Sequence, residues 1–178
     1  MNKSFKVIDL SGYSFSGKSA VYDLLSEFNG CRQHGKNFEF ELLRVQNGIL
    51  DLYNDLVKNW SPVRSSEAIR SFNKLVKAYR GGNSVSSRLT RMGHKYDMFF
   101  PGFTSLSLEY VKTLTIATWK SEWPFAFDTC SMEEIFFRKV LFRLGYTSIF
   151  ETDVFLSRFE KKEFIDITKK YLNQLFLS

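Results

Sequence analysis

Eight consecutive residues, from Gly12 to Ser19, have the types and the spacing that phosphate binding requires. They read GYSFSGKS and match the pattern G-x-x-x-x-G-K-[ST]. The two glycines allow a tight loop whose backbone N–H groups, from about Ser14 onward, point into one concavity. Lys18 would hold its ammonium group against the outer phosphates, and the Ser19 hydroxyl would ligate magnesium. We therefore expect nucleotide phosphates to be bound by Gly12, Tyr13, Ser14, Phe15, Ser16, Gly17, Lys18 and Ser19.

The residues before and after this loop predict the elements that would position it. Before it, the range from Phe5 to Leu10 is short, apolar and β-branched, which favours a buried parallel strand. After it, apolar residues recur at helical spacing until Gly30, namely Val21, Leu24, Leu25 and Phe28. Because the N-terminus of a helix attracts anions, this order of strand, loop and helix would reinforce a phosphate site.

Together these residues resemble the phosphate-binding loop of the P-loop nucleoside triphosphate hydrolase and kinase superfamily. The resemblance is specific over roughly the first 30 residues and carries over Gly12, Gly17, Lys18 and Ser19. It implies an α/β fold, a three-layer P-loop sandwich with a short parallel sheet, and ATP and Mg²⁺ as cofactors. Two later segments, FEFELLRVQNGILDL and WSPVRSSEAIRSFNKLV, resemble bacterial P-loop proteins of sugar metabolism that are described as kinase-like or sulfotransferase-like.

Acidic residues elsewhere could complete such a site. Nucleotide hydrolases hold magnesium through an acid at the end of an apolar strand, and Asp128 in WPFAFD and Asp153 in IFETD are candidates. Asp9, on the predicted first strand, is a third candidate. The alternative is that each is an acid at a turn. Of these we expect Asp128 to join Ser19 as a metal ligand.

Two glutamates are candidates for the base of a phosphotransfer reaction. Glu39 and Glu41 alternate with apolar residues in NFEFEL, from Asn37 to Leu42, which favours a second short strand. Only one of them can point toward the loop, because side chains alternate along a strand. In that position it could accept the proton of an acceptor hydroxyl. The alternative is an ion pair with Arg44 or exposure to solvent.

Positive charge is concentrated in one segment. Between Arg64 and Lys95 lie eight basic residues and a single acid, Glu67. Arg88 and Arg91 fall in the glycine-flanked stretch GGNSVSSRLTRMGHKYD and are candidates for a mobile lid that neutralises a transferring phosphoryl group. The alternative is a solvated helix face followed by an exposed loop.

The remaining pattern is mostly helical. Apolar stripes predict helices over about 49–60, 66–80, 107–119, 132–144 and 158–177. Ser65 or Ser66, Ser131 and Ser157 are the expected N-caps. WPFAFD and TSIFETDVF are candidates for further strands. We expect one domain over residues 1–178 with a helical lid insertion over about 62–105, and the small number of strands suggests a chain truncated at its C-terminus.

Composition excludes several classes of protein. Two cysteines and two histidines form no disulfide framework and no zinc motif. No apolar run is long enough to cross a bilayer, because Asp9, Lys112 and Lys120 interrupt the best candidates. We therefore expect a cytoplasmic protein without a membrane span.

Three functions remain open at this point. The favoured one is an ATP- and Mg²⁺-dependent phosphotransferase acting on a small hydroxylated or sugar-type acceptor. A second is a sulfotransferase-like protein that uses a PAPS-type donor, an adenosine bisphosphate carrying a sulfuryl group. It is less favoured because sulfuryl transfer needs no metal, whereas Ser19 suits one. The third is a non-enzymatic nucleotide- or nucleic-acid-binding module, although no aromatic spacing typical of an RNA-recognition sheet is present.

Overall fold

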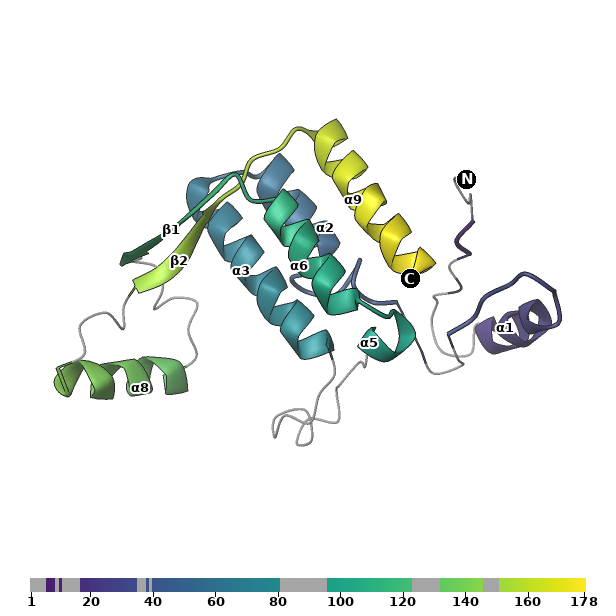
Figure 1. The fold of residues 1–178 in the computed structure, drawn as a ribbon, viewed down its shortest axis with the longest axis horizontal. Helices are drawn as coiled ribbons and strands as arrows, with labels where there is room; N and C mark the ends of the chain where they lie inside the picture. The colour runs from purple at the N-terminus through teal and green to yellow at the C-terminus, as the bar shows by residue number, and fades with distance from the viewer. Residues whose placement is uncertain are drawn as a thin grey trace. The chain divides into compact units, whose positions relative to one another are not determined.

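The structure is a computed structural model, and it describes residues 6–8, 10, 17–34, 38, 40–80, 96–122, 132–145 and 151–178. Residue contacts divide the chain into two compact units, residues 1–41 and 42–178. The described part is rich in helices and contains one small sheet (Figure 1). The expectation of one domain with a lid insertion over 62–105 stays a prediction.

The described part of the first unit contains one helix, α1 (Lys18–Ser26). After the helix the chain turns through Gly30, and the side-chain amide of Gln33 donates to the Tyr22 carbonyl at 2.9 Å. This helix confirms the sequence prediction. Its apolar stripe, however, is largely at the surface: Val21 is 44% exposed, Leu24 60% and Phe28 58%.

Neither strand predicted for this unit is found among its described residues. Lys6, Val7, Ile8 and Leu10 are in no regular element, and neither are Phe38, Phe40 and Glu41. Val7 and Ile8 are exposed. An apolar β-branched run favours a strand only where a partner strand accepts its hydrogen bonds, so the pattern alone was not sufficient here.

The second unit is built around packed helices. Its helices are α2 (Ile49–Tyr53), the π-helix η1 (Asn54–Lys58), α3 (Pro62–Tyr79), α5 (Tyr96–Phe99), α6 (Phe103–Thr113), α8 (Met132–Arg143) and α9 (Lys161–Leu177). Helix α6 packs against both α3 and α9 (Figure 1). Large buried side chains fill the space between these helices, among them Leu56, Ile69, Phe72, Tyr96, Phe103 and Leu175.

Helix α3 begins earlier than the sequence suggests. Its N-cap is Ser61, whose hydroxyl accepts a hydrogen bond from the Arg64 amide at 3.1 Å, and Pro62 occupies the first helical position. The prediction that Ser65 or Ser66 caps this helix is therefore wrong. Both serines are buried inside it, and the Ser66 hydroxyl accepts a hydrogen bond from the Phe155 amide at 3.2 Å. Ser66 thus joins α3 to the neighbouring strand.

The sheet is an antiparallel pair rather than the expected parallel sheet. Strand β1 (Ala117–Glu122) pairs with β2 (Glu151–Leu156), with Ala117 opposite Leu156 and Glu122 opposite Glu151. The strand predicted in TSIFETDVF is confirmed by β2. The helix predicted to continue to Trp119 is wrong at its end, because α6 stops at Thr113. The β-branched residues Thr115, Ile116 and Thr118 that follow favour extended backbone.

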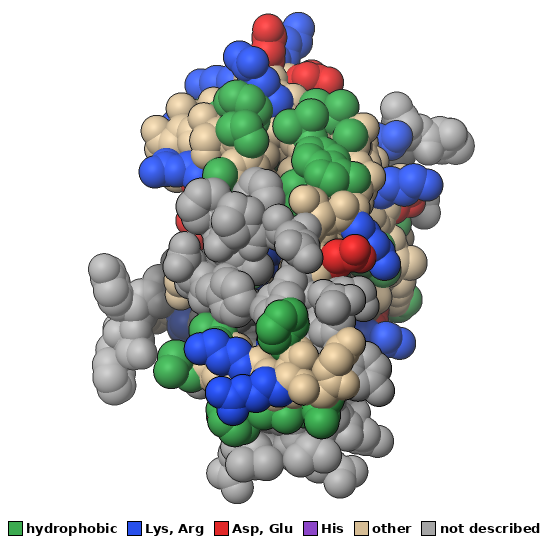
Figure 2. Space-filling model, turned by 90° about the vertical axis from the view of Figure 1, so that its left-hand side faces the viewer, with side chains coloured by type: hydrophobic (Ala, Val, Ile, Leu, Met, Phe, Trp, Pro, Cys, Tyr) green, Lys and Arg blue, Asp and Glu red, His purple; other side chains and the backbone are tan. Residues whose placement is uncertain are grey.

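Helices α8 and α9 lie where the apolar pattern predicts them, but α9 does not begin at its predicted cap. The N-cap of α9 is Glu160, without a side-chain cap, so the predicted cap Ser157 is wrong. Ser157 is instead buried, and its hydroxyl donates to the Leu114 carbonyl at 2.5 Å. The predicted cap Ser131 lies outside the described residues. Helix α8 has exposed apolar side chains, among them Phe136 and Phe137, and hydrophobic and basic side chains lie together on this side of the molecule (Figure 2).

Two buried hydroxyl pairs join α6 to α9. Ser107 and Tyr171 share a hydrogen bond of 2.7 Å, and Tyr110 and Thr168 share one of 2.9 Å. The two tyrosine rings stack with their centroids 4.4 Å apart. Burial raises the pKa of both tyrosine hydroxyls, so both stay protonated at ordinary pH.

No helix in the described ranges has both the length and the apolar character required to span a membrane.

Candidate phosphate-binding site

Gly17 immediately precedes the only helix described in the first unit, and its backbone is left-handed. Its φ is 78° and its ψ is 4°. A side chain at this position would meet no atom within 4 Å, so space does not require glycine there. The backbone conformation does, because left-handed φ values strain residues that carry a Cβ. The second glycine of the motif therefore occupies a position that its type explains.

Helix α1 turns directly after this glycine. The Gly17 carbonyl accepts hydrogen bonds from the amides of Ala20 at 3.0 Å and Val21 at 3.3 Å. Lys18 and Ser19 therefore form the first two helical positions. The N–H groups of the first turn of a helix have no acceptor within the helix, and the helix dipole places partial positive charge there. The Ser19 side chain is exposed and that of Lys18 is half-buried.

The structure describes a minority of the residues that the sequence predicts for the site. Gly17, Lys18 and Ser19 are adjacent at the start of α1, and Glu41 is half-buried in a segment without regular structure. The other predicted residues lie outside the described residues, namely Asp9, Gly12, Tyr13, Ser14, Phe15, Ser16, Glu39, Arg88, Arg91 and Asp128. Their roles stay predictions.

Asp153 does not end a strand, as an acid that holds magnesium in a hydrolase would. It is the third residue of β2, it is exposed, and it lies opposite Lys120 of β1. Its backbone carbonyl accepts a hydrogen bond from the Arg70 guanidinium at 2.9 Å, which ties the strand to α3. We therefore assign Asp153 a place in the antiparallel strand pair and not at a metal site.

His34 is a titratable residue of the first unit that the sequence interpretation considered only as a zinc ligand. Its ring contacts that of Phe38, with centroids 5.5 Å apart. Burial lowers the pKa of His34, and the charge of Arg32 lowers it further. The imidazole is therefore neutral near pH 7 and able to accept a proton. In the sequence, the feature that could have drawn attention to His34 is its position in the stretch CRQHGK, soon after the predicted helix that follows the motif.

The described residues contain no group of three or more His, Cys, Asp and Glu side chains arranged to hold a metal ion. Of the described residues predicted to bind magnesium, Ser19 lies in the first turn of α1, where its hydroxyl could act together with phosphate oxygens and water, as is common for magnesium beside nucleotides.

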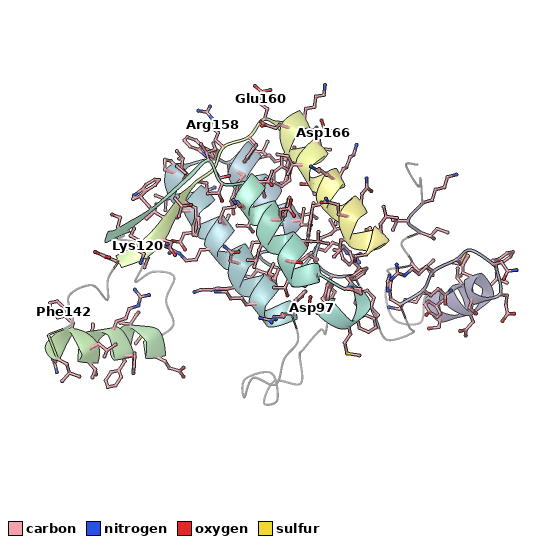
Figure 3. All side chains as sticks on the ribbon, in the orientation of Figure 1. Asp97, Lys120, Phe142, Arg158, Glu160 and Asp166 are labelled. Carbon is pink, nitrogen blue, oxygen red and sulfur yellow. The ribbon has the colours of Figure 1, made fainter. Side chains whose placement is uncertain are left out.

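A hollow of about 560 Å³ lies in the second unit between η1 and the start of α9. The Arg158 guanidinium covers the Trp60 ring at 4.8 Å, and the Trp60 N–H donates to the Ser157 carbonyl at 2.6 Å. Arg158 and Glu160 point outward at this end of the molecule (Figure 3). Through these contacts Trp60 holds the segment between β2 and α9 in place. This structural role explains the position of Trp60 without a ligand in the hollow.

Comparisons with protein-family models, curated proteins and solved structures find no match to this chain.

Proposed function

We propose that this chain binds the phosphate groups of ATP, with Mg²⁺, in the loop from Gly12 to Ser19 and transfers a phosphoryl group to a small hydroxylated or sugar-type acceptor. The observation that supports this best is the left-handed Gly17 directly before α1, within a complete G-x-x-x-x-G-K-[ST] motif. A coincidental match to the motif requires neither a helix that begins at the lysine nor a left-handed glycine before it.

In this proposal the roles follow from the chemistry of each side chain. Lys18 neutralises the outer phosphates, and Ser19 and Asp128 hold magnesium. Glu39 or Glu41 accepts the proton of the acceptor hydroxyl, and Arg88 and Arg91 stabilise the charge on the transferring group. A three-layer P-loop sandwich with a short parallel sheet belongs to the same proposal.

The test is protection against thermal unfolding by a panel of nucleotides. We expect ATP to raise the melting temperature of the protein in the presence of Mg²⁺. Lys18→Ala should abolish this shift without lowering the melting temperature of the protein alone. Lys6→Ala, which removes an exposed lysine of the same unit outside the motif, should keep the shift.

Two results would contradict the proposal. Equal protection of wild type and Lys18→Ala would show that the nucleotide binds elsewhere. Protection by adenosine 3′,5′-bisphosphate that needs no metal, in place of protection by ATP, would favour the sulfotransferase-like alternative.

A further inference from the structure

Helix α8 differs from the other long helices of the second unit, because none of its described side chains is buried. Helix α3 buries Ile69 and Phe72, among others, and α9 buries Phe164 and Leu175. On α8 and directly after it, six large apolar side chains are between 39% and 81% exposed, namely Met132, Phe136, Phe137, Val140, Phe142 and Leu144. The described core of the unit therefore makes no use of these side chains.

Most of the apolar residues of α8 share one face of the helix. The spacing i, i+1, i+4, i+5, i+8 covers a single face at about 100° per residue, and it is followed by Phe136, Phe137, Val140, Leu141 and Leu144. Leu144 comes directly after the helix but continues its turn, because its amide donates to the Val140 carbonyl at 3.2 Å. We call these five residues the apolar face of α8.

Positive charge borders the apolar face on both sides. At the same turn per residue, Arg138 lies on one side of it, and Lys139 and Arg143 lie on the other. Over residues 135–150 the sequence contains these three cations and no acid. Lys139 and Arg143 are exposed, and hydrophobic and basic side chains lie together on this side of the molecule (Figure 2). One partner can therefore meet both the apolar face and the cations at its borders.

This combination indicates an anionic lipid surface as the partner. A helix in a membrane interface inserts an apolar face, while lysine and arginine at its borders reach the headgroups. A nucleic-acid strand would need flat rings for base stacking, but three of the five residues of the apolar face are aliphatic. A second copy of α8 packed on this face would bring the cations in the middle of both helices together, which like charges oppose.

We propose that α8 binds the surface of membranes that contain anionic lipids and lies in the plane of the interface, with its apolar face among the acyl chains. The 12 residues of α8 extend roughly 18 Å, at about 1.5 Å per residue. This is shorter than the hydrocarbon core of a bilayer, at roughly 30 Å, so the helix would lie along the surface. The proposal is independent of nucleotide binding at α1.

The experiment measures flotation of the full chain with two kinds of vesicle, phosphatidylcholine with phosphatidylserine in a roughly 3:1 ratio and phosphatidylcholine alone. We expect binding to the anionic vesicles that weakens with added salt, and binding to the neutral vesicles that is about tenfold weaker or less. Phe136→Ala/Phe137→Ala should weaken binding to the anionic vesicles about tenfold or more, because apolar burial in the lipid is lost. Lys139→Gln/Arg143→Gln should weaken it about tenfold and leave binding to neutral vesicles unchanged.

Two control variants remove the same kinds of side chain elsewhere in the second unit. Leu50→Ala/Leu108→Ala removes exposed apolar side chains of α2 and α6. Lys169→Gln/Lys170→Gln removes two exposed lysines of α9. Both controls should bind vesicles as wild type does. Because the substituted side chains of all four variants are exposed, each variant should keep the melting temperature of wild type.

Four results would overturn the proposal. The first is the absence of binding to anionic vesicles, and the second is equal binding to both kinds of vesicle. The third is equal weakening by the control variants, which would show attraction to net charge or general apolarity. The fourth is a dimer that Phe136→Ala/Phe137→Ala dissociates, without vesicle binding, which would assign the apolar face to a second copy. Lys18→Ala should bind vesicles as wild type does, which separates this test from that of nucleotide binding.

Discussion

The carbonyl oxygen of Gly17 accepts a hydrogen bond from the Ala20 amide at 3.0 Å, so α1 begins to turn immediately after a left-handed glycine. The chain thus enters the helix by an abrupt change of direction that a residue with a Cβ adopts only under strain. The proposed anion site depends on this entry, because it determines where the amides of Lys18 and Ser19 point.

Replacing Gly17 by alanine should weaken nucleotide binding. The left-handed conformation costs a non-glycine residue about 1–2 kcal/mol, which corresponds to a roughly 5- to 30-fold loss of affinity if the loop must keep that conformation to bind. Gly30→Ala is the matched control, because Gly30 is also left-handed, with φ of 94°, and also has open space around it. Titration of ATP with Mg²⁺ into both variants checks this, and equal losses would count against a special role for Gly17.

Replacing Ser19 by alanine should remove the contribution of magnesium to nucleotide binding. Ser19 is exposed and in the first turn of α1, so its hydroxyl is available to a metal ion and its loss should not affect folding. We expect wild type to bind ATP more tightly with Mg²⁺ than without it, and Ser19→Ala to bind ATP equally under both conditions. Ser26→Ala removes an exposed hydroxyl from the other end of α1, where it bonds the Asp23 carbonyl, and should retain the metal effect. A full metal effect in Ser19→Ala would exclude this residue as a ligand.

Stability of the second unit should depend on its buried hydroxyl pairs. Tyr171→Phe leaves the buried Ser107 hydroxyl without its partner, at a cost of about 1–3 kcal/mol in the free energy of unfolding. The double variant Ser107→Ala/Tyr171→Phe should be less destabilised than the sum of the two single variants, because neither hydroxyl is then left unpaired.

The control for this pair is Tyr53→Phe. Tyr53 is half-buried, and its hydroxyl makes no hydrogen bond within the described residues. Denaturant unfolding should show a smaller effect for this variant. A loss as large as that of Tyr171→Phe would mean that the hydroxyl pair contributes nothing specific.

His34 should titrate below its ordinary pKa of 6.5, because burial and then Arg32 both disfavour the imidazolium. The unfolded chain then binds a proton at a higher pH than the folded chain does. Stability supplied by neutral His34 is therefore fully present above pH 6.5 and is lost as the pH falls from 6.5 toward the lower pKa of the folded state. An NMR titration of the imidazole of His34, in a His94→Gln background, measures the midpoint. A midpoint at or above 6.5 would contradict the burial of this ring.

The sequence predicted best those features that depend on local chemistry. Helical spacing located α1, α3 and α9, and in α3 and α9 the apolar pattern marks the face of the helix that is buried. The glycine at position 17 could be assigned to a special backbone conformation from its place in the motif. Both inferences concern residues close together in the chain.

The errors concern contacts between distant segments. Ser157 and Ser66 have the side chains of helix caps, but each bonds a backbone group far away in the sequence, at Leu114 and Phe155. The two strands expected in the first unit are not found among its described residues for the same reason, because pairing depends on a partner that no local pattern identifies. Residues 117–119 fall within a predicted helix, but they form the start of β1 because they pair with β2 in an antiparallel register.

The most direct test of the central claim is a two-dimensional amide NMR spectrum recorded while ATP and Mg²⁺ are added. If the loop before α1 binds phosphate, the amide resonances of Gly17, Lys18 and Ser19 will move first and farthest, and Lys18→Ala will suppress the change. If these three resonances stay in place while others move, or if nothing moves at all, the start of α1 is not an anion site and the proposed phosphotransferase function is wrong.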